Sequence, residues 1–229
     1  PLSPLLSNII LDVLDKELES RHHRFCRYAD DCNVYVRSKR AGERLMSSMT
    51  RFLERKLRLQ VNQQKSAVDR PSKRQFLGYS VLARKTAPLT VALDRESRMK
   101  AKARPILRAG RGRQIAATIQ ALAPKIRGWA SYYQHCDVKA AFERFDEWLR
   151  RRIRAIYWRH WKRPRTRQRE LEKRGIDPER AWKSANNGRG PWWNAGASHM
   201  NLAVKTQELR ALGYVSLLEE YQRLKRSAG

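Results

Sequence analysis

Apolar side chains recur every three or four positions across residues 2–18, which is the spacing of a helix with one wide apolar face. Ser3 followed by Pro4 fits a capping residue and a first-turn proline. Two strand-like runs follow at residues 24–29 and 32–37, and apolar and polar positions alternate in the second run. The chain is therefore expected to begin with a helix and a β-hairpin.

A second helical pattern covers residues 41–58, and short strands are expected near Ala67, at residues 75–79 and at residues 89–92. The order helix, strand, strand, helix, strand predicts an antiparallel sheet backed by helices. After about residue 93 the strand patterns end and helix-length patterns dominate.

The helices expected in this second part cover residues 93–107, 112–134, 138–160, 165–174 and about 205–226, the last interrupted near Gly213. Residues 186–196 are rich in Gly, Asn and Trp, and we predict an ordered loop that keeps Trp192 and Trp193 away from water. The patterns together predict an α+β chain whose strands all lie in its first part.

The net charge of the chain limits the kinds of partner that it can bind. The 229 residues include 50 Lys and Arg but only 22 Asp and Glu, which gives a formal net charge of +28. Such a surface attracts polyanions. Because 41% of the residues are hydrophobic, the chain can fold, and a wholly disordered basic tail is not expected. We therefore expect a folded nucleic-acid-binding protein.

The cysteines and the apolar runs exclude other classes. Cys26, Cys32 and Cys136 show no spacing typical of zinc sites, and we expect small apolar side chains in a reducing compartment. No run approaches the roughly 18 apolar residues of a membrane span, and no signal-peptide pattern is found. The chain begins at Pro1 rather than at Met, and we expect the start of the protein to lie upstream.

Two adjacent acids, Asp30 and Asp31, lie between the two strand-like runs, where the hairpin is expected to turn. At a turn both carboxylates can approach one point, whereas on a regular strand they would face opposite sides. Two such charges about 4 Å apart repel by roughly 4 kcal/mol at an effective dielectric constant of about 20, and a bound cation would offset this. Oxygen ligands favour Mg²⁺ or Mn²⁺, and the pair suits two-metal phosphoryl transfer. The alternative is an ordinary polar turn.

Five motifs, in order along the chain, resemble those of reverse transcriptases encoded by group II introns. Residues 27–31 (RYADD) resemble the YxDD box, and its Ala is similar to that of the intron-encoded proteins. The other four are residues 1–8, which resemble the helix after the PQG motif, residues 61–66, which resemble the NxxKS/T element, residues 76–79, which resemble the FLGY primer grip, and residues 125–133, which resemble the KxRGWxxYY helix of the maturase, or X, domain.

The resemblance implies that residues 1–92 form the C-terminal part of a polymerase palm, an antiparallel sheet with helices. Residues 93–229 would form an α-helical thumb/maturase (X) domain that binds RNA. The implied activity is RNA-directed DNA synthesis with Mg²⁺, or alternatively Mn²⁺, on an RNA template with a DNA primer and dNTPs. The implied partner is group II intron RNA, whose splicing and mobility the protein would assist in the bacterial cytoplasm. No endonuclease domain is implied, since a Cys/His-rich tail is absent from the sequence.

The same resemblance implies roles for residues of the first part. Asp30 and Asp31 would be metal ligands and, together with Lys65 near the nucleotide phosphates, catalytic residues. Residues expected at the primer end or along the primer strand are Tyr28, Ala29, Phe76, Leu77, Gly78 and Tyr79. The residue types alone leave alternatives open: Lys65 fits a solvated surface, Gly78 fits a plain bulge, and Phe76 and Tyr79 fit a core.

In the second part, residues 150–169 hold ten Lys or Arg and no acid. We expect RNA contacts from Lys125, Arg127, Arg150, Arg151, Arg154, Arg159, Lys162, Arg163 and Arg165. The interleaved aromatic residues are expected mainly in the core. RNA with loops and bulges fits this composition better than major-groove DNA readout, because no recognition-helix pattern is found.

The resemblance also implies a further palm Asp on a strand upstream of Pro1, and neither that strand, the PQG motif nor the fingers region lies within the 229 residues. A rival interpretation is therefore a non-catalytic RNA-binding splicing factor that retains YADD as a remnant. A third is a basic DNA-binding protein without an RNA role.

Overall fold

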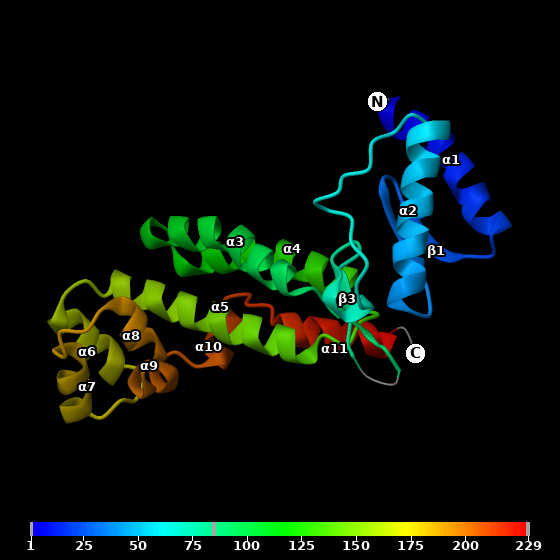
Figure 1. Cartoon of the computed structure of the whole chain (residues 1–229). Coiled ribbons are helices and arrows are strands. Elements are labelled where there is room, and N and C mark those ends of the chain that lie inside the picture. Colours follow the sequence, from blue (N-terminus) through cyan, green and yellow to red (C-terminus); the bar gives the residue numbers. More distant parts are fainter. Residues whose placement is uncertain (1, 84–85, 228–229) are drawn as a thin grey trace. The chain divides into compact units, whose positions relative to one another are not determined.

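A computed structural model describes residues 2–83 and 86–227 of the chain (Figure 1). The chain is mostly helical with two small antiparallel sheets, which agrees with the predicted α+β class. It divides into two compact units, Pro1–Ala87 and Pro88–Gly229. We call these unit 1 and unit 2, and the assignment of residues 1–92 to a palm and residues 93–229 to a thumb stays a prediction.

Unit 1 contains two long helices, a hairpin and two short elements. In chain order these are α1 (Ser3–Ser20), β1 (Arg24–Tyr28), β2 (Asp31–Tyr35), α2 (Lys39–Lys56), the 3₁₀ helix η1 (Pro71–Lys73) and β3 (Tyr79–Val81). The predicted strand near Ala67 is not formed, and residues 57–70 instead follow an irregular path.

The core of unit 1 lies between the two helices and the hairpin. Leu14 and Leu18 of α1 are buried against Met49 of α2, and Phe25 and Val34 of the hairpin pack on this cluster. The Ser38 hydroxyl accepts a hydrogen bond from the Ala41 amide at 3.2 Å and so caps α2. The predicted cap by Ser3 is wrong, because the N-cap of α1 is Leu2 and no side chain caps it.

Only the C-terminal half of the apolar face of α1 is covered. The large apolar residues of its N-terminal half are exposed by 44–73%, namely Leu2, Leu5, Leu6, Ile9 and Ile10. The periodicity thus predicted the helix correctly, but these five side chains have no apolar cover from the described residues of unit 1.

Unit 2 is built from helices apart from one short strand. Its elements are β4 (Leu89–Val91), α3 (Leu93–Ala109), η2 (Gly110–Gly112), α4 (Ile115–Tyr132), α5 (Lys139–His160), α6 (Pro164–Glu172), α7 (Pro178–Ala185), α8 (Pro191–Gly196), α9 (Ser198–Ala203), α10 (Thr206–Ala211) and α11 (Leu217–Ser227). The break expected near Gly213 is confirmed, since this glycine, at φ +92°, separates α10 from α11.

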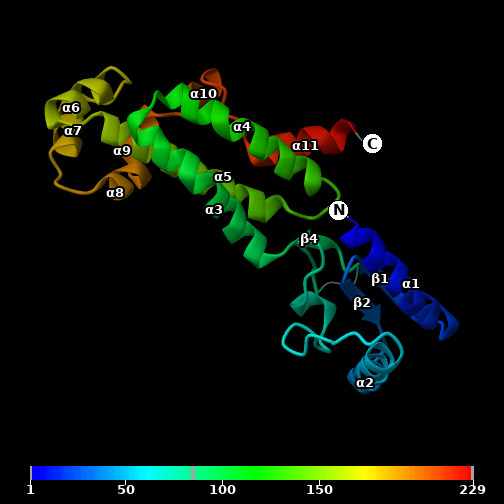
Figure 2. The same ribbon diagram turned by 90° about the horizontal axis from the view of Figure 1, so that it is seen from above.

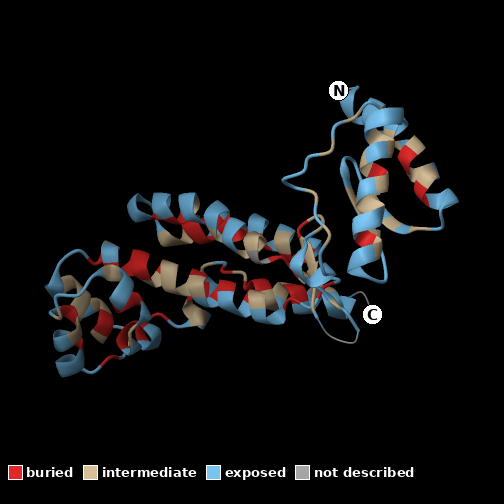
Figure 3. Cartoon of the chain, viewed as in Figure 1, coloured by how far each residue is buried: buried red, intermediate tan, exposed pale blue. Residues whose placement is uncertain are grey.

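Helix α5 runs through unit 2, and α6 to α9 gather at one of its ends (Figure 2). Phe142, Leu149, Ile153 and Trp158 of α5 are fully buried. Buried positions lie on one face in the first part of this helix and all round it at residues 155–158 (Figure 3), so the aromatic residues of α5 mostly lie in the core, as predicted.

A buried aspartate of α5 holds the last helix in place. Asp146 is 2% exposed and accepts hydrogen bonds from the Tyr214 and Ser216 hydroxyls at 3.1 and 2.6 Å. It also accepts from the amides of Leu217 and Leu218 at 2.9 and 3.1 Å, which are free donors at the start of α11. Burial and the neighbouring carboxylate raise the pKa of Tyr214.

The loop predicted at residues 186–196 is in part a helix, α8, and its tryptophans are not withdrawn from water. Trp192 and Trp193 are 41% and 45% exposed. Asn194 is buried instead, and its side-chain amide donates to the Arg189 carbonyl at 2.8 Å. The prediction failed because arginines, rather than a core, cover the indoles: Arg189 lies 4.3 Å from the Trp193 ring centroid.

We predict that Asp146→Ala lowers the free energy of unfolding by about 3 kcal/mol, because four donors lose their acceptor and one of them is the buried backbone amide of Leu217. Urea denaturation followed by circular dichroism measures the effect. The matched control is Asp177→Ala, which removes an exposed N-cap from α7 that accepts from Arg180 at 3.0 Å and should cost about 1 kcal/mol. Equal losses in the two variants would contradict the anchoring role of Asp146.

Candidate active site and nucleic-acid interface

The acidic turn lies at the exposed tip of the β1–β2 hairpin. Tyr28 pairs with Asp31 across the two strands, so Ala29 and Asp30 form the two-residue turn. Ala29 has φ +51°, a left-handed conformation that costs a non-glycine residue about 1 kcal/mol. Tyr28, Ala29, Asp30 and Asp31 are all exposed. The expected position of Asp31 is off by one residue: it is the first residue of β2 rather than part of the turn.

An arginine fixes this turn to helix α1. The Arg27 guanidinium donates to the Asp15 carboxylate at 2.8 Å through Nε and at 2.5 Å through Nη2. Its Nη1 donates to the Ala29 carbonyl at 2.9 Å and to the Asn8 side chain at 3.1 Å. The hydrogen bonds that Arg27 donates to Asp15 raise the pKa of the guanidinium. Sequence reasoning missed this contact, since Asp15 is twelve positions away on another element and no local pattern links the two residues.

The two carboxylates fit a hydrated divalent cation. Mg²⁺ commonly takes one or two protein carboxylates and completes its shell with water and phosphate oxygens. Within the described part of the chain, no group of three or more His, Cys, Asp or Glu is placed to hold a metal ion. Asp30 and Asp31 can therefore supply oxygen ligands of the type that Mg²⁺ prefers, but not a closed protein cage.

Lys65 is exposed on a turn that Asn62 organises. The Asn62 side chain accepts hydrogen bonds from the amides of Gln64 at 3.1 Å and Lys65 at 3.2 Å. Asparagine stabilises such turns through this bond to the backbone, which gives the spacing between Asn62 and Lys65 a local physical reason. The Lys65 side chain is exposed to solvent, as expected for a lysine at the surface.

The segment Phe76–Tyr79 forms a tight turn of its own. Phe76 and Tyr79 exchange two backbone hydrogen bonds of 2.9 Å, and Leu77 and Gly78 between them have φ +52° and +84°. Positive φ at both central positions is typical of a type I′ hairpin turn, where glycine is favoured. Gly78 is therefore explained by turn conformation rather than by a bulge.

Arg74 connects Lys65 to the tight turn. Its Nη2 donates to the Lys65 carbonyl at 2.7 Å, and its own carbonyl accepts from the Ser80 hydroxyl at 3.0 Å. The structure thus joins Lys65 and Phe76–Tyr79 in one hydrogen-bonded group, whereas the acidic turn is held by Arg27 and α1.

The basic residues of unit 2 fall into two groups. Those with exposed side chains are Lys125, Arg127, Arg159, Lys162, Arg163 and Arg165. Arg150, Arg151 and Arg154 are half-buried instead. Arg151 Nη2 donates to the Trp192 carbonyl and Arg154 Nε to the Val204 carbonyl, each at 3.1 Å. Burial lowers the pKa of Arg154, and both residues help to position the segment that follows α7.

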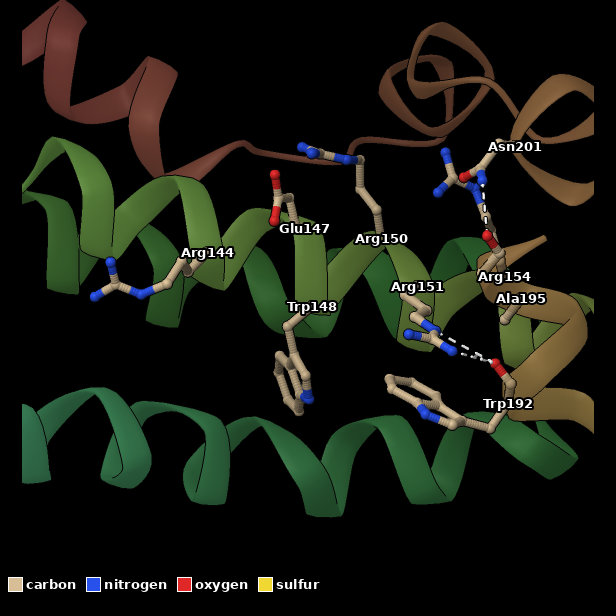
Figure 4. Close-up of a pocket in the computed structure, with 10 residues that line it drawn as sticks. Arg144, Glu147, Trp148, Arg150, Arg151, Arg154, Trp192, Ala195 and Asn201 are labelled. Atoms are coloured by element: carbon tan, nitrogen blue, oxygen red, sulfur yellow. Dashed lines mark hydrogen bonds between the residues drawn. The ribbon is translucent and has the colours of Figure 1, made fainter. Parts of the chain in front are cut away.

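Arg150, Arg151 and Arg154 line an open groove between α5, α8 and α9 (Figure 4). Its volume is about 510 Å³, and Arg144, Arg150, Trp148 and Trp192 contribute to its walls. Asn201 at its rim donates to the Gly196 carbonyl at 3.1 Å. A second cavity, lined partly by α3, contains Arg104, Arg108 and Arg111. Sequence reasoning missed these three arginines, although Arg104 and Arg108 share a helix face by their spacing.

Two segments of the chain are similar to known families. Residues 1–81 match the family described as reverse transcriptase (RNA-dependent DNA polymerase), and residues 96–175 match the group II intron, maturase-specific domain. The first match lies within unit 1 and the second within unit 2. The two matches, in this order, confirm the resemblance to the reverse transcriptase/maturase proteins of group II introns. No curated protein matches the chain.

The described residues contain no helix that is both long enough and apolar enough to span a bilayer.

The Arg27–Asp15 pair should couple measurably, because it is bidentate and its side chains are only 13% and 22% exposed. A double-mutant cycle with Arg27→Gln and Asp15→Asn is expected to give a coupling free energy of about 1–2 kcal/mol in urea denaturation. The control pair, Lys16 and Asp12 on the same helix, is exposed by 73% and 54% and should show no measurable coupling. Equal coupling in both cycles would remove the special role of Arg27.

Proposed function

We propose that this chain forms part of an RNA-directed DNA polymerase that also binds group II intron RNA and assists its splicing and mobility. The observation that carries the proposal is the acidic turn: two adjacent carboxylates are exposed at a hairpin tip in a chain of net charge +28, within a region matched to reverse transcriptases. Exposed adjacent carboxylates are suited to bind a cation rather than a nucleic-acid phosphate.

In this proposal Asp30 and Asp31 bind Mg²⁺, which when bound would activate a primer 3′-hydroxyl and stabilise the pyrophosphate leaving group. The Arg27 hydrogen bond to the Ala29 carbonyl fixes the backbone of the turn that carries Asp30, so the turn is formed before substrate arrives. Ala29 and Tyr28 lie next to them, where a small side chain leaves room for the primer end.

The turn made by Phe76, Leu77, Gly78 and Tyr79 is proposed to steady the primer strand. Its reciprocal backbone hydrogen bonds make it a compact, pre-formed turn. Lys65, tied to this turn through Arg74, would place an ammonium group near the nucleotide phosphates and give a proton to departing pyrophosphate.

RNA binding is proposed for unit 2. Residues 150–169 carry ten cations without an acid, and the exposed Arg159, Lys162, Arg163 and Arg165 follow one another at the end of α5 and the start of α6. Arginine binds phosphate through two parallel hydrogen bonds and also stacks on unpaired bases, so an RNA with loops suits this surface.

A second candidate is RNA binding without DNA synthesis. The arginine-lined groove of unit 2 favours it, because that groove involves no residue of the acidic turn. The two candidates differ in whether Asp30 matters.

The proposal predicts that Asp30→Ala abolishes extension of a DNA primer on an RNA template with Mg²⁺, by at least about 100-fold, in a protein containing this chain. RNA affinity should stay within about twofold, because the turn lies outside the basic surface. Glu43→Ala, which removes another exposed carboxylate of unit 1, should leave extension unchanged. Continued synthesis by the Asp30 variant would refute its role as a metal ligand, and RNA binding without any wild-type synthesis would favour the second candidate.

Replacing Arg159, Arg163 and Arg165 together by Gln should weaken binding of a structured RNA and make its salt dependence shallower. Each lost phosphate contact reduces the slope of log K against log salt by about 0.9. Fluorescence anisotropy over a KCl series measures both effects. The matched control replaces Arg40, Arg44 and Arg55, three exposed arginines of α2, and should change the slope less. If both triple variants lost the same slope, the basic surface of unit 2 would not be the RNA site.

A further inference from the structure

Two adjacent arginines of α5, Arg151 and Arg152, contact the indole of Trp192 but differ in their hydrogen bonds. The Arg151 guanidinium lies 4.1 Å from the Trp192 ring centroid and donates to the Trp192 carbonyl (Figure 4). It also occupies the space that a side chain at Gly196 would need, since a Cβ there would lie 2.8 Å from the guanidinium carbon. Arg151 is therefore committed to holding α8.

Arg152 has no such commitment. Its guanidinium carbon lies 4.6 Å from the Trp192 ring centroid and 5.5 Å from that of Trp148. Its Nε–H is buried and finds no hydrogen-bond acceptor among the described residues. A buried donor without an acceptor is costly. Four arginines have such an Nε–H among the described residues, and of these four Arg152 is the one that lines an arginine-rich cavity.

The surroundings of Arg152 are positive. A cavity of about 310 Å³ between α3, η2, α5 and α8 is lined by five arginines, and no acid belongs to its lining: Arg104, Arg108, Arg111, Arg152 and Arg159. We call this cavity the five-arginine pocket. Burial, and then the like charges of Arg104, Arg111 and Arg151, lower the pKa of Arg152.

Trp192 also lines the five-arginine pocket and is 41% exposed. It therefore presents an aromatic surface beside a concentration of guanidinium groups. Aromatic rings stack on nucleobases, and arginines bind phosphates bidentately, so one wall is suited to a base and the rest to phosphates.

We propose that the five-arginine pocket binds an unpaired, sharply turned segment of RNA, whose consecutive phosphates enter the pocket while one base stacks on Trp192. This rests on the proposed RNA binding by unit 2 and names the RNA feature that the unit selects. A regular duplex cannot satisfy the site, because its bases are stacked inside and its phosphates are spread over a convex surface. A bulge or tight loop brings phosphates together and frees a base.

The test compares two fluorescent RNAs with the full 229-residue chain: a hairpin of about 16 base pairs, and the same hairpin with an adenosine bulge. Wild-type protein should bind the bulged RNA about tenfold more tightly, the effect of stacking a single base. Trp192→Ala should lose most of this preference and keep its affinity for the regular hairpin within about twofold.

A second variant tests the phosphates without altering α8. Arg104 and Arg108 are exposed on α3, so replacing both by Gln should not perturb the core. It should weaken the bulged complex about tenfold and reduce its salt slope by about 1.4, the value for two single-strand phosphates. The control, Arg169→Gln with Lys173→Gln, removes two exposed charges around the end of α6 and should leave the preference for the bulge intact.

The outcomes separate the two proposals. If wild type binds neither RNA, the proposed RNA-binding function fails, and this inference fails with it. If wild type binds both hairpins equally, or if the control pair loses as much preference as the Arg104 and Arg108 pair, only the inference is overturned. It is also overturned if free tripolyphosphate displaces the bulged RNA at equal concentration, since the pocket would then be a site for small polyanions.

Discussion

The arrangement of this protein depends on how 50 cationic side chains are accommodated beside only 22 acids. Aromatic rings take over much of the work that carboxylates usually do. The described residues contain nine cation–π contacts, about three times the number typical of a chain of this length. Arg167 over Trp158 and Arg174 over Trp161, at 4.7 and 5.0 Å, are examples from the core of unit 2. A ring stabilises a guanidinium without neutralising it.

That difference connects folding to function. A surface whose arginines were paired with acids would be closed to phosphate, whereas stacked arginines keep their full charge and several of their donors. Arg151 uses its guanidinium to hold the backbone of α8, whereas the Nε–H of Arg152 has no acceptor among the described residues. Several of the few acids have specific positions. Asp146 anchors α11, Asp15 orients Arg27, and Asp30 and Asp31 are exposed at the hairpin tip.

Much of the local structure could be predicted from the sequence, because it depends on periodicity. The helices at 3–20, 39–56 and 139–160 and the hairpin at 24–35 lie within about two residues of their expected bounds. What failed depends on contacts between distant positions. On hydrophobicity alone, Trp192 was expected in a loop and away from water. Its exposed ring is instead contacted by the guanidinium of Arg151, which lies 41 positions earlier in the chain. The positions of Asp30 and Lys65 followed from motifs, whereas the Arg27 contact that holds the turn and the arginines of α3 had no local signal.

The central claim is that the uncompensated arginines of unit 2 meet the phosphates of an RNA. The most direct measurement is the affinity of the wild-type chain for a structured RNA across a KCl series. Six or more phosphate contacts predict a slope of log K against log salt of about −5 or steeper. A slope shallower than about −2 would contradict the account, because it would mean that the protein contacts only about two phosphates.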